Sequence, residues 1–131
     1  GVVVFGREAM ARDANVPVER VGQLAVVRIG TDDRLEDVIE KPDAATLASF
    51  GDDVYVSMNC WRFTPPVMDA CGRVAPSPRG ELELPDAVRL AMTRMGVSFR
   101  VIRMNAGVLD LSSRADVAAV AARLADVTVR L

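Results

Sequence analysis

The sequence contains no histidine, and only two of its 131 residues are cysteine. Without histidine, the chain lacks the commonest general base, the Ser-His and Cys-His nucleophile systems, and the usual ligand of zinc or copper. Cys60 and Cys71 are eleven positions apart and show no metal-ligand spacing. We expect Cys60 to be a buried thiol and Cys71 to lie at a helix end. Chemistry is therefore left to carboxylates, lysine, arginine and metal-bound water.

Long apolar runs and clusters of basic residues are also lacking. No apolar run approaches the ~20 residues that span a bilayer, and the first five residues, GVVVF, do not have the pattern of a signal peptide. The formal net charge is -2 and the arginines are spread along the chain, which argues against binding to nucleic acid. We expect one soluble, cytoplasmic domain, residues 1–131, that binds neither nucleic acid nor a membrane.

Lysine is nearly absent, because fifteen arginines stand against Lys41 alone. Lys41 lies between Glu40 and Pro42, directly after an alternating apolar run. Its compact ammonium on a flexible stem suits a point contact to a phosphate, whereas a guanidinium presents a planar fork. The alternative is that an arginine-rich composition left one surface lysine by chance.

Apolar periodicity predicts strands and helices that alternate along the chain. Alternation predicts strands over residues 2–5, 23–29, 35–40, 54–63 and 99–104. Helical spacing predicts helices over residues 7–13, 44–50, 65–71, 84–95 and 113–125. Such alternation predicts an α/β fold, a mixed β-sheet flanked by helices.

Turn and capping residues predict how these elements end. Asn15 and Pro17 end the first helix, and Gly96 stops the helix over 84–95. Because Pro42 biases the preceding residue away from helix, we expect Lys41 to leave the sheet in an extended conformation. The last helix opens on a capping-box-like start at Ser113, with one apolar face. That face consists of Val117, Val120, Ala121 and Leu124.

Polar groups at the ends of strands are the expected address of a site in an α/β sheet. Glu40 and Lys41 end one strand, and Asp110 lies where an apolar piece, residues 108–111, passes into the last helix. A carboxylate among apolar neighbours needs a partner. The sequence leaves three open for Asp110: an arginine, helix N–H groups or a metal ion.

Weaker candidates lie between these positions. Arg79 is followed by Glu81 and Glu83, and Asn59 interrupts an apolar strand. The alternatives are that Arg79 and the two glutamates are solvated, and that Asn59 bonds only to backbone.

Taken in order, four stretches carry a family resemblance. They are Glu40-Lys41-Pro42, Ser57-Met58-Asn59, Arg79-Gly80-Glu81-Leu82-Glu83 and Gly107-Val108-Leu109-Asp110. This succession resembles the C-terminal half of the nucleotidyltransferase domain of sugar-1-phosphate nucleotidyltransferases, such as glucose-1-phosphate thymidylyltransferase. The resemblance extends from about residue 23 to residue 124.

The resemblance implies a reaction and a set of roles. A sugar 1-phosphate attacks the α-phosphorus of a nucleoside triphosphate, giving a nucleotide sugar and pyrophosphate, with Mg²⁺ as cofactor. It implies that Lys41 is catalytic and holds the sugar phosphate, and that Glu40 bonds to sugar hydroxyls. Asn59 would lie beside the sugar, Arg79 would reach the phosphate, Glu81 would belong to the same substrate-binding set, and Asp110 would hold Mg²⁺.

The nucleotide-binding half of such an enzyme has no counterpart in the sequence, because no G-x-G-x-x-G follows a predicted strand. We expect residues 1–131 to be the sugar-phosphate-binding half of a larger domain, inactive without the part upstream. The alternative is a module of the same fold that binds a sugar phosphate without catalysis or has a structural role. A homo-oligomer is also possible, since a split sheet exposes an edge.

Overall fold

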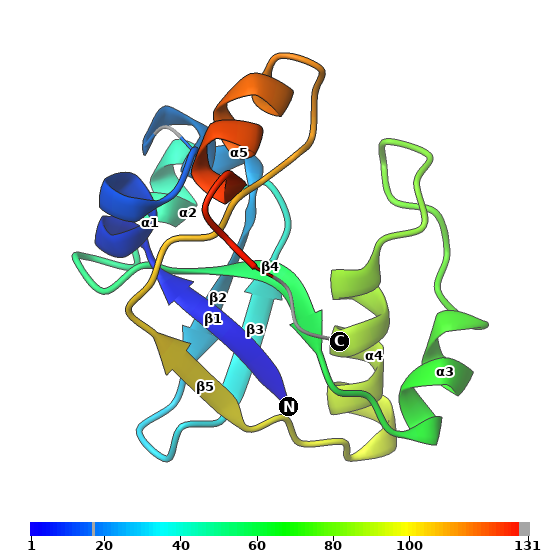
Figure 1. Ribbon diagram of the computed structural model, residues 1–131. Helices are drawn as coiled ribbons and strands as arrows, with labels where there is room; N and C mark the ends of the chain where they lie inside the picture. Colours follow the sequence, from blue (N-terminus) through cyan, green and yellow to red (C-terminus); the bar gives the residue numbers. More distant parts are fainter. Residues whose placement is uncertain (17, 129–131) are drawn as a thin grey trace.

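The structure is a computed structural model that describes residues 1–16 and 18–128, and it has the predicted α/β class (Figure 1). The strands are β1 (Val2–Gly6), β2 (Ala25–Ile29), β3 (Leu35–Ile39), β4 (Tyr55–Trp61) and β5 (Val101–Met104). The helices are α1 (Arg7–Asp13), α2 (Ala44–Ala48), α3 (Pro65–Cys71), α4 (Leu84–Met95) and α5 (Asp116–Leu124), with a 3₁₀ helix η1 (Val18–Gln23). The expected role of Pro17 in ending the first helix lies outside the described residues.

The five strands form one mixed sheet in the order β3-β2-β4-β1-β5. Strand β1 pairs in parallel with β5 and antiparallel with β4, while β2 pairs antiparallel with β3 and β4. The sheet also curls until its two edge strands meet. Arg34 and Arg100 form a bridge, the Leu35 N–H donates to the Phe99 carbonyl at 3.0 Å, and the Val101 N–H donates to the Asp33 carbonyl at 2.8 Å.

Helices α3 and α4 lie together beside the sheet, and Figure 1 shows α1, α2 and α5 gathered at its upper end. The larger core fills the space between the sheet and α3 and α4. Its buried members include Val2, Val4, Val27, Val38, Val67, Ala70, Val88, Ala91 and Phe99. A smaller core under α1 contains Met10, Val16, Val26, Val54 and Val56.

Helix α4 follows its sequence signals. Pro85 occupies its first turn, and Gly96 ends it in the left-handed conformation at φ 67°. Arg89 on α4 pairs with Asp37 on β3, with 2.7 Å between Nε and Oδ1. This ion pair joins the middle of α4 to the middle of β3.

Two predictions for the segment around β2 and β3 are wrong. Gln23 belongs to η1, so the strand begins at Ala25. Lys41 is not extended, because its φ is 45°. The residue before proline is kept out of the right-handed helical region, and the chain must reverse sharply before α2, which the Asp43 carboxylate caps by accepting from the Thr46 N–H at 2.7 Å. A left-handed Lys41 satisfies both conditions.

Two other predictions are wrong for reasons of packing. Cys60 is exposed, because β4 carries a bulge that changes the register opposite Val3 and Val4. Helix α5 begins at Asp116 rather than at residue 113, and its apolar face is largely uncovered: only Val120 is buried, while Val117 and Leu124 are about half exposed. Cys71 ends α3 as predicted. Among the described residues, no helix has the length and apolar character needed to cross a membrane.

Candidate active site

Glu40 and Lys41 follow directly after β3 and lie between buried neighbours. Val38 before them and Pro42 after them are buried, whereas Lys41 itself is exposed. A positive φ is uncommon for a side chain as large as lysine and costs about 1 to 3 kcal/mol when it is held. The anchored backbone therefore fixes the point from which the ammonium of Lys41 extends.

The carboxylate of Glu40 lies close to four other charged groups. Burial raises the pKa of Glu40 above its ordinary value, and the nearby Lys41 opposes this rise. The charges of Glu83, Arg79 and Glu81 also act on the same carboxylate. The charges of Arg79 and Glu81, which are distant from Glu40 in sequence, thus act on the same carboxylate as the adjacent Lys41.

Arg79 is held in a tight loop before α4. The Ser77 N–H donates to the Glu81 carbonyl at 2.8 Å, and Gly80 takes the left-handed conformation at φ 77° that the turn requires. The guanidinium of Arg79 lies 2.9 Å from the Glu83 carboxylate and 3.6 Å from that of Glu81. The side chain of Glu83 is only 10% exposed, so the alternative that Glu83 is a solvated flank is wrong.

Asn59 projects from the bulge of β4. Met58 and Asn59 are extra residues on β4, because Val3 pairs with Cys60 and Val4 pairs with Ser57. Asn59 has φ 57°, and its backbone N–H donates to the hydroxyl of the buried Ser57 at 3.4 Å. Bulges commonly redirect a side chain beside a functional site, and this one leaves the Asn59 side chain exposed.

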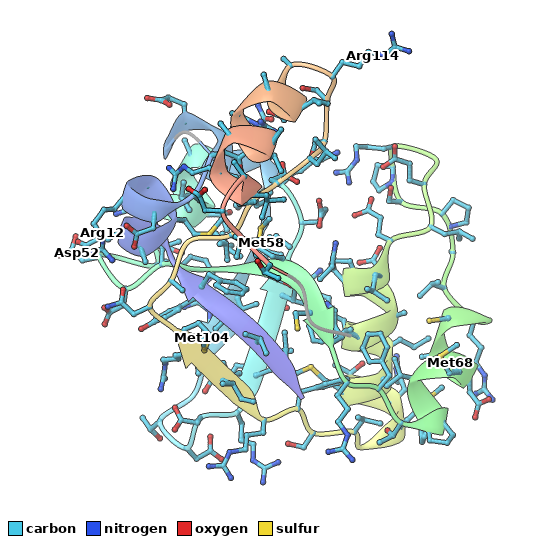
Figure 2. All side chains as sticks on the ribbon, viewed as in Figure 1. Arg12, Asp52, Met58, Met68, Met104 and Arg114 are labelled. Atoms are coloured by element: carbon cyan, nitrogen blue, oxygen red, sulfur yellow. The ribbon has the colours of Figure 1, made fainter. Side chains whose placement is uncertain are left out.

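A hollow of about 230 Å³ joins these elements, and we call it the Glu40 hollow. Its lining consists of Gln23, Leu24, Ala25, Glu40, Ser57, Met58, Asn59, Asp110 and Ser112. Figure 2 labels Met58, which lies on β4 near the middle of the view. All six residues singled out from the sequence therefore either line this hollow or act on the charge of Glu40.

Asp110 is paired with an arginine, which was one of the three partners that the sequence left open. Its Oδ2 lies 3.2 Å from the guanidinium of Arg20 and accepts from the Ser112 hydroxyl at 2.6 Å. The side chain of Asn15 makes two hydrogen bonds to the backbone of Asp110. Its amide N–H donates to the Asp110 carbonyl at 2.6 Å, and its Oδ1 accepts from the Asp110 N–H at 2.7 Å. Arg20 also lies 3.6 Å from Asp116.

Sequence reasoning missed Asn15 and Arg20. They lie 95 and 90 positions from Asp110, and no local pattern links them. Gly107 is a residue from which this contact could have been inferred. A Cβ at this position would lie 2.3 Å from the backbone carbon of Asp13, so only glycine lets the segment before Asp110 approach the end of α1 so closely.

The residues around Asp110 do not by themselves form a site for Mg²⁺. This ion prefers octahedral coordination by oxygens, with carboxylates as its usual protein ligands. In residues 1–16 and 18–128, no group of three or more His, Cys, Asp or Glu side chains gathers closely enough to hold a metal ion. The oxygen of Asp110 that faces Arg20 is already matched by a cation.

A comparison with known protein families identifies the family of the chain. The family model described as nucleotidyl transferase matches residues 7–125, which is most of the chain. The chain belongs to the nucleotidyl transferase family. No curated protein sequence matches it closely enough to count as a relative. Members of the nucleotidyl transferase family generally act on nucleoside triphosphates with a divalent metal ion.

Proposed function

We propose that this chain forms the sugar-phosphate-binding part of a nucleotidyltransferase that transfers a nucleoside monophosphate from a nucleoside triphosphate to a sugar 1-phosphate. The observation that supports it is that Glu40 and Asn59 line one hollow, while the charges of Lys41 and Arg79 act on the carboxylate of Glu40. Two cations beside hydrogen-bonding groups suit a ligand with one phosphate and several hydroxyls.

Each side chain has a distinct role in this proposal. Lys41 contacts the phosphate of the acceptor as a point charge, and Arg79 contacts it with the planar guanidinium that Glu83 holds in place. The carboxylate of Glu40 accepts hydrogen bonds from sugar hydroxyls, and the amide of Asn59 lies beside the sugar. Glu81 belongs to the substrate-binding set through its contact with Arg79.

The reaction requires positioning and charge neutralisation more than covalent chemistry. An oxygen of the sugar phosphate forms a bond to the α-phosphorus, the bond from the α-phosphorus to the bridging oxygen breaks, and pyrophosphate leaves. Lys41 and Arg79 hold the attacking phosphate and reduce its repulsion from the triphosphate. This mechanism needs no histidine.

We propose that the triphosphate binds outside these residues, in the part of a larger domain that completes the site. Asp110 as a ligand of Mg²⁺ stays a prediction of the family resemblance, and no step above depends on it.

The test is calorimetric titration with glucose 1-phosphate, and with glucose as the control that lacks the phosphate. We expect the phosphate ester to bind, glucose not to bind, and Lys41→Ala to weaken binding about tenfold or more. Arg114→Ala, which removes an exposed cation from the loop before α5, is the control and should bind as the wild type does. Equal binding by Lys41→Ala and wild type would disprove the role of Lys41. Binding without nucleotidyl transfer in the complete protein would instead indicate a module that binds sugar phosphates.

A further inference from the structure

A second polar cavity lies around Asp53, Tyr55 and Arg103, and we call it the Arg103 cavity. It consists of two adjoining hollows of about 350 and 420 Å³ that share these three residues. None of its lining residues belongs to the Glu40 hollow. Its size is in the range of small-molecule sites.

The position of the Arg103 cavity in the fold also favours a ligand. The parallel strands β1 and β5 end at its wall, with Gly6 and Met104 among the lining residues. The carboxyl ends of parallel strands are where ligands of α/β sheets usually bind. In Figure 2, the labelled Met104 and Asp52 mark this region on the left of the view.

Two arginines in the cavity are held against aromatic rings. The guanidinium of Arg28 lies 4.5 Å from the ring centroid of Phe50, and that of Arg103 lies 5.7 Å from the ring centroid of Tyr55. Such stacking fixes the plane of a guanidinium and leaves the N–H groups at its edge to donate. Arg103 is also paired with Asp33, whereas Arg28 has no ion pair among the described residues.

The two hollows differ in the sign of their charge. The lining of the hollow on the side of Arg28 contains two cations, Arg28 and Arg103, and one carboxylate, Asp53. Because Asp33 already pairs with Arg103, Arg28 is the cation of this lining without an ion pair among the described residues, and it suits an anion. The other hollow adds more carboxylates than cations, and Asp52 and Asp53 form no ion pair within the described residues. Free carboxylates accept hydrogen bonds from hydroxyl groups.

We propose that the Arg103 cavity binds a small phosphate ester with free hydroxyl groups. Its phosphate contacts Arg28 and Arg103, and its hydroxyls extend toward Asp52 and Asp53. This site is separate from the sugar-phosphate site of the proposed function and does not depend on it.

The experiment titrates the protein with glycerol 3-phosphate, inorganic phosphate and glycerol, using calorimetry on the wild type and on Lys41→Ala. The Lys41→Ala background weakens binding at the Glu40 hollow, and the Arg28→Gln variant then shows which site holds the binding that persists. We expect glycerol 3-phosphate to bind in both proteins, inorganic phosphate to bind more weakly, and glycerol not to bind.

Variants then place the ligand. Arg28→Gln, in the Lys41→Ala background, should raise the dissociation constant of glycerol 3-phosphate about tenfold or more. Because Arg28 is exposed and unpaired among the described residues, this variant should keep the thermal stability of its parent. The matched control Arg114→Gln should leave binding unchanged. Asp52→Asn with Asp53→Asn should reduce the preference for glycerol 3-phosphate over inorganic phosphate.

Two outcomes would overturn the proposal. One is the absence of glycerol 3-phosphate binding in the Lys41→Ala protein. The other is equal affinity in the Arg28→Gln variant and its parent. Equal affinity for inorganic phosphate and glycerol 3-phosphate would overturn the part that assigns hydroxyls to Asp52 and Asp53.

Discussion

Glu40 and Asp110 line the same hollow, yet their surroundings differ in how charge is matched. The surroundings of Glu40 contain three carboxylates, counting Glu40 itself, and two cations. They are Glu40, Glu81, Glu83, Lys41 and Arg79. The ammonium of Lys41 is exposed and forms no ion pair among the described residues. Around Asp110, the carboxylate has a guanidinium and a hydroxyl, and Asn15 satisfies the backbone on both sides. A site that binds ligands needs groups that are still free to pair. This comparison suggests that the Glu40 side is built for a ligand and that the Asp110 side is built to hold the fold.

Replacing Lys41 should have the largest effect, and the effect should be on function. Removing a charge-assisted contact to a reacting phosphate costs on the order of 2 to 4 kcal/mol of transition-state stabilisation, so Lys41→Ala in a complete enzyme should lower kcat/KM about 30- to 10³-fold. Steady-state kinetics and thermal unfolding measure the two effects. Because Lys41 is exposed, its loss should change the free energy of unfolding by less than about 0.5 kcal/mol. A large loss of stability with intact turnover would mean that the Glu40 side, like the Asp110 side, holds the fold rather than a ligand.

Gly107→Ala should destabilise the fold around Asp110, because the new methyl group would clash with the backbone at the end of α1. The added Cβ would lie 2.3 Å from the backbone carbon of Asp13 and 2.5 Å from the nitrogen of Ala14, and these backbone atoms cannot move without shifting α1. We expect a loss of about 1 to 3 kcal/mol in the free energy of unfolding, measured with urea. The control is Gly72→Ala, where the new Cβ would come no closer than 3.6 Å to its neighbours. Equal stability of the two variants would contradict the close approach.

A double-mutant cycle on Arg20 and Asp110 tests whether this pair is structural. Arg20→Gln and Asp110→Asn should each lower the free energy of unfolding by about 1 kcal/mol, and the double variant should lose less than the sum. Urea unfolding at neutral pH measures all four proteins. Strict additivity would mean that the 3.2 Å contact contributes nothing and that Asp110 is free for another partner.

The smallest effect concerns Glu40 and pH. Burial raises its pKa in the folded state, so the stability associated with the protonated form is present at low pH and is lost as the pH rises through the folded pKa. We therefore expect Glu40→Gln to be slightly more stable than the wild type at pH 7. That gap should close when urea unfolding is repeated near pH 4.

Glu36→Gln, at an exposed glutamate on β3, is the control for the charge change alone. The comparison between the Glu40 and Asp110 sides would be weakened if Glu40→Gln were less stable than the wild type at pH 7, because Glu40 would then have its own structural partner.

Local signals in the sequence predicted most of the elements but not their finer geometry. Helix α4 follows from Pro85, its apolar spacing and Gly96, and all of these act within one helix length. The bulge at Met58 and Asn59 was not predicted, because it depends on how β4 meets β1 more than fifty positions away. The apolar face of α5 was predicted, but its exposure was not, since periodicity reports that a face exists and not whether another element packs on it.

The candidate site divides in the same way. Five of the six residues chosen from the sequence lie after strand ends or in loops, which short patterns reveal, whereas Asn59 lies in the bulge of β4. The partners Arg20 and Asn15 contact Asp110 only in the folded chain, and nothing near them in sequence distinguishes them from other surface residues.

The strand order has a consequence for how the chain is made. Of the five strands in this sheet, β1 comes first in the sequence, yet both of its neighbours, β4 and β5, come later. Its apolar sequence, Val-Val-Val-Phe-Gly, therefore lacks its antiparallel partner until Tyr55–Trp61 have been added and its parallel partner until Val101–Met104 follow. A strand without its partners is a target for aggregation or for a chaperone, so yield in expression should depend on how quickly synthesis proceeds from β1 to the end of β5.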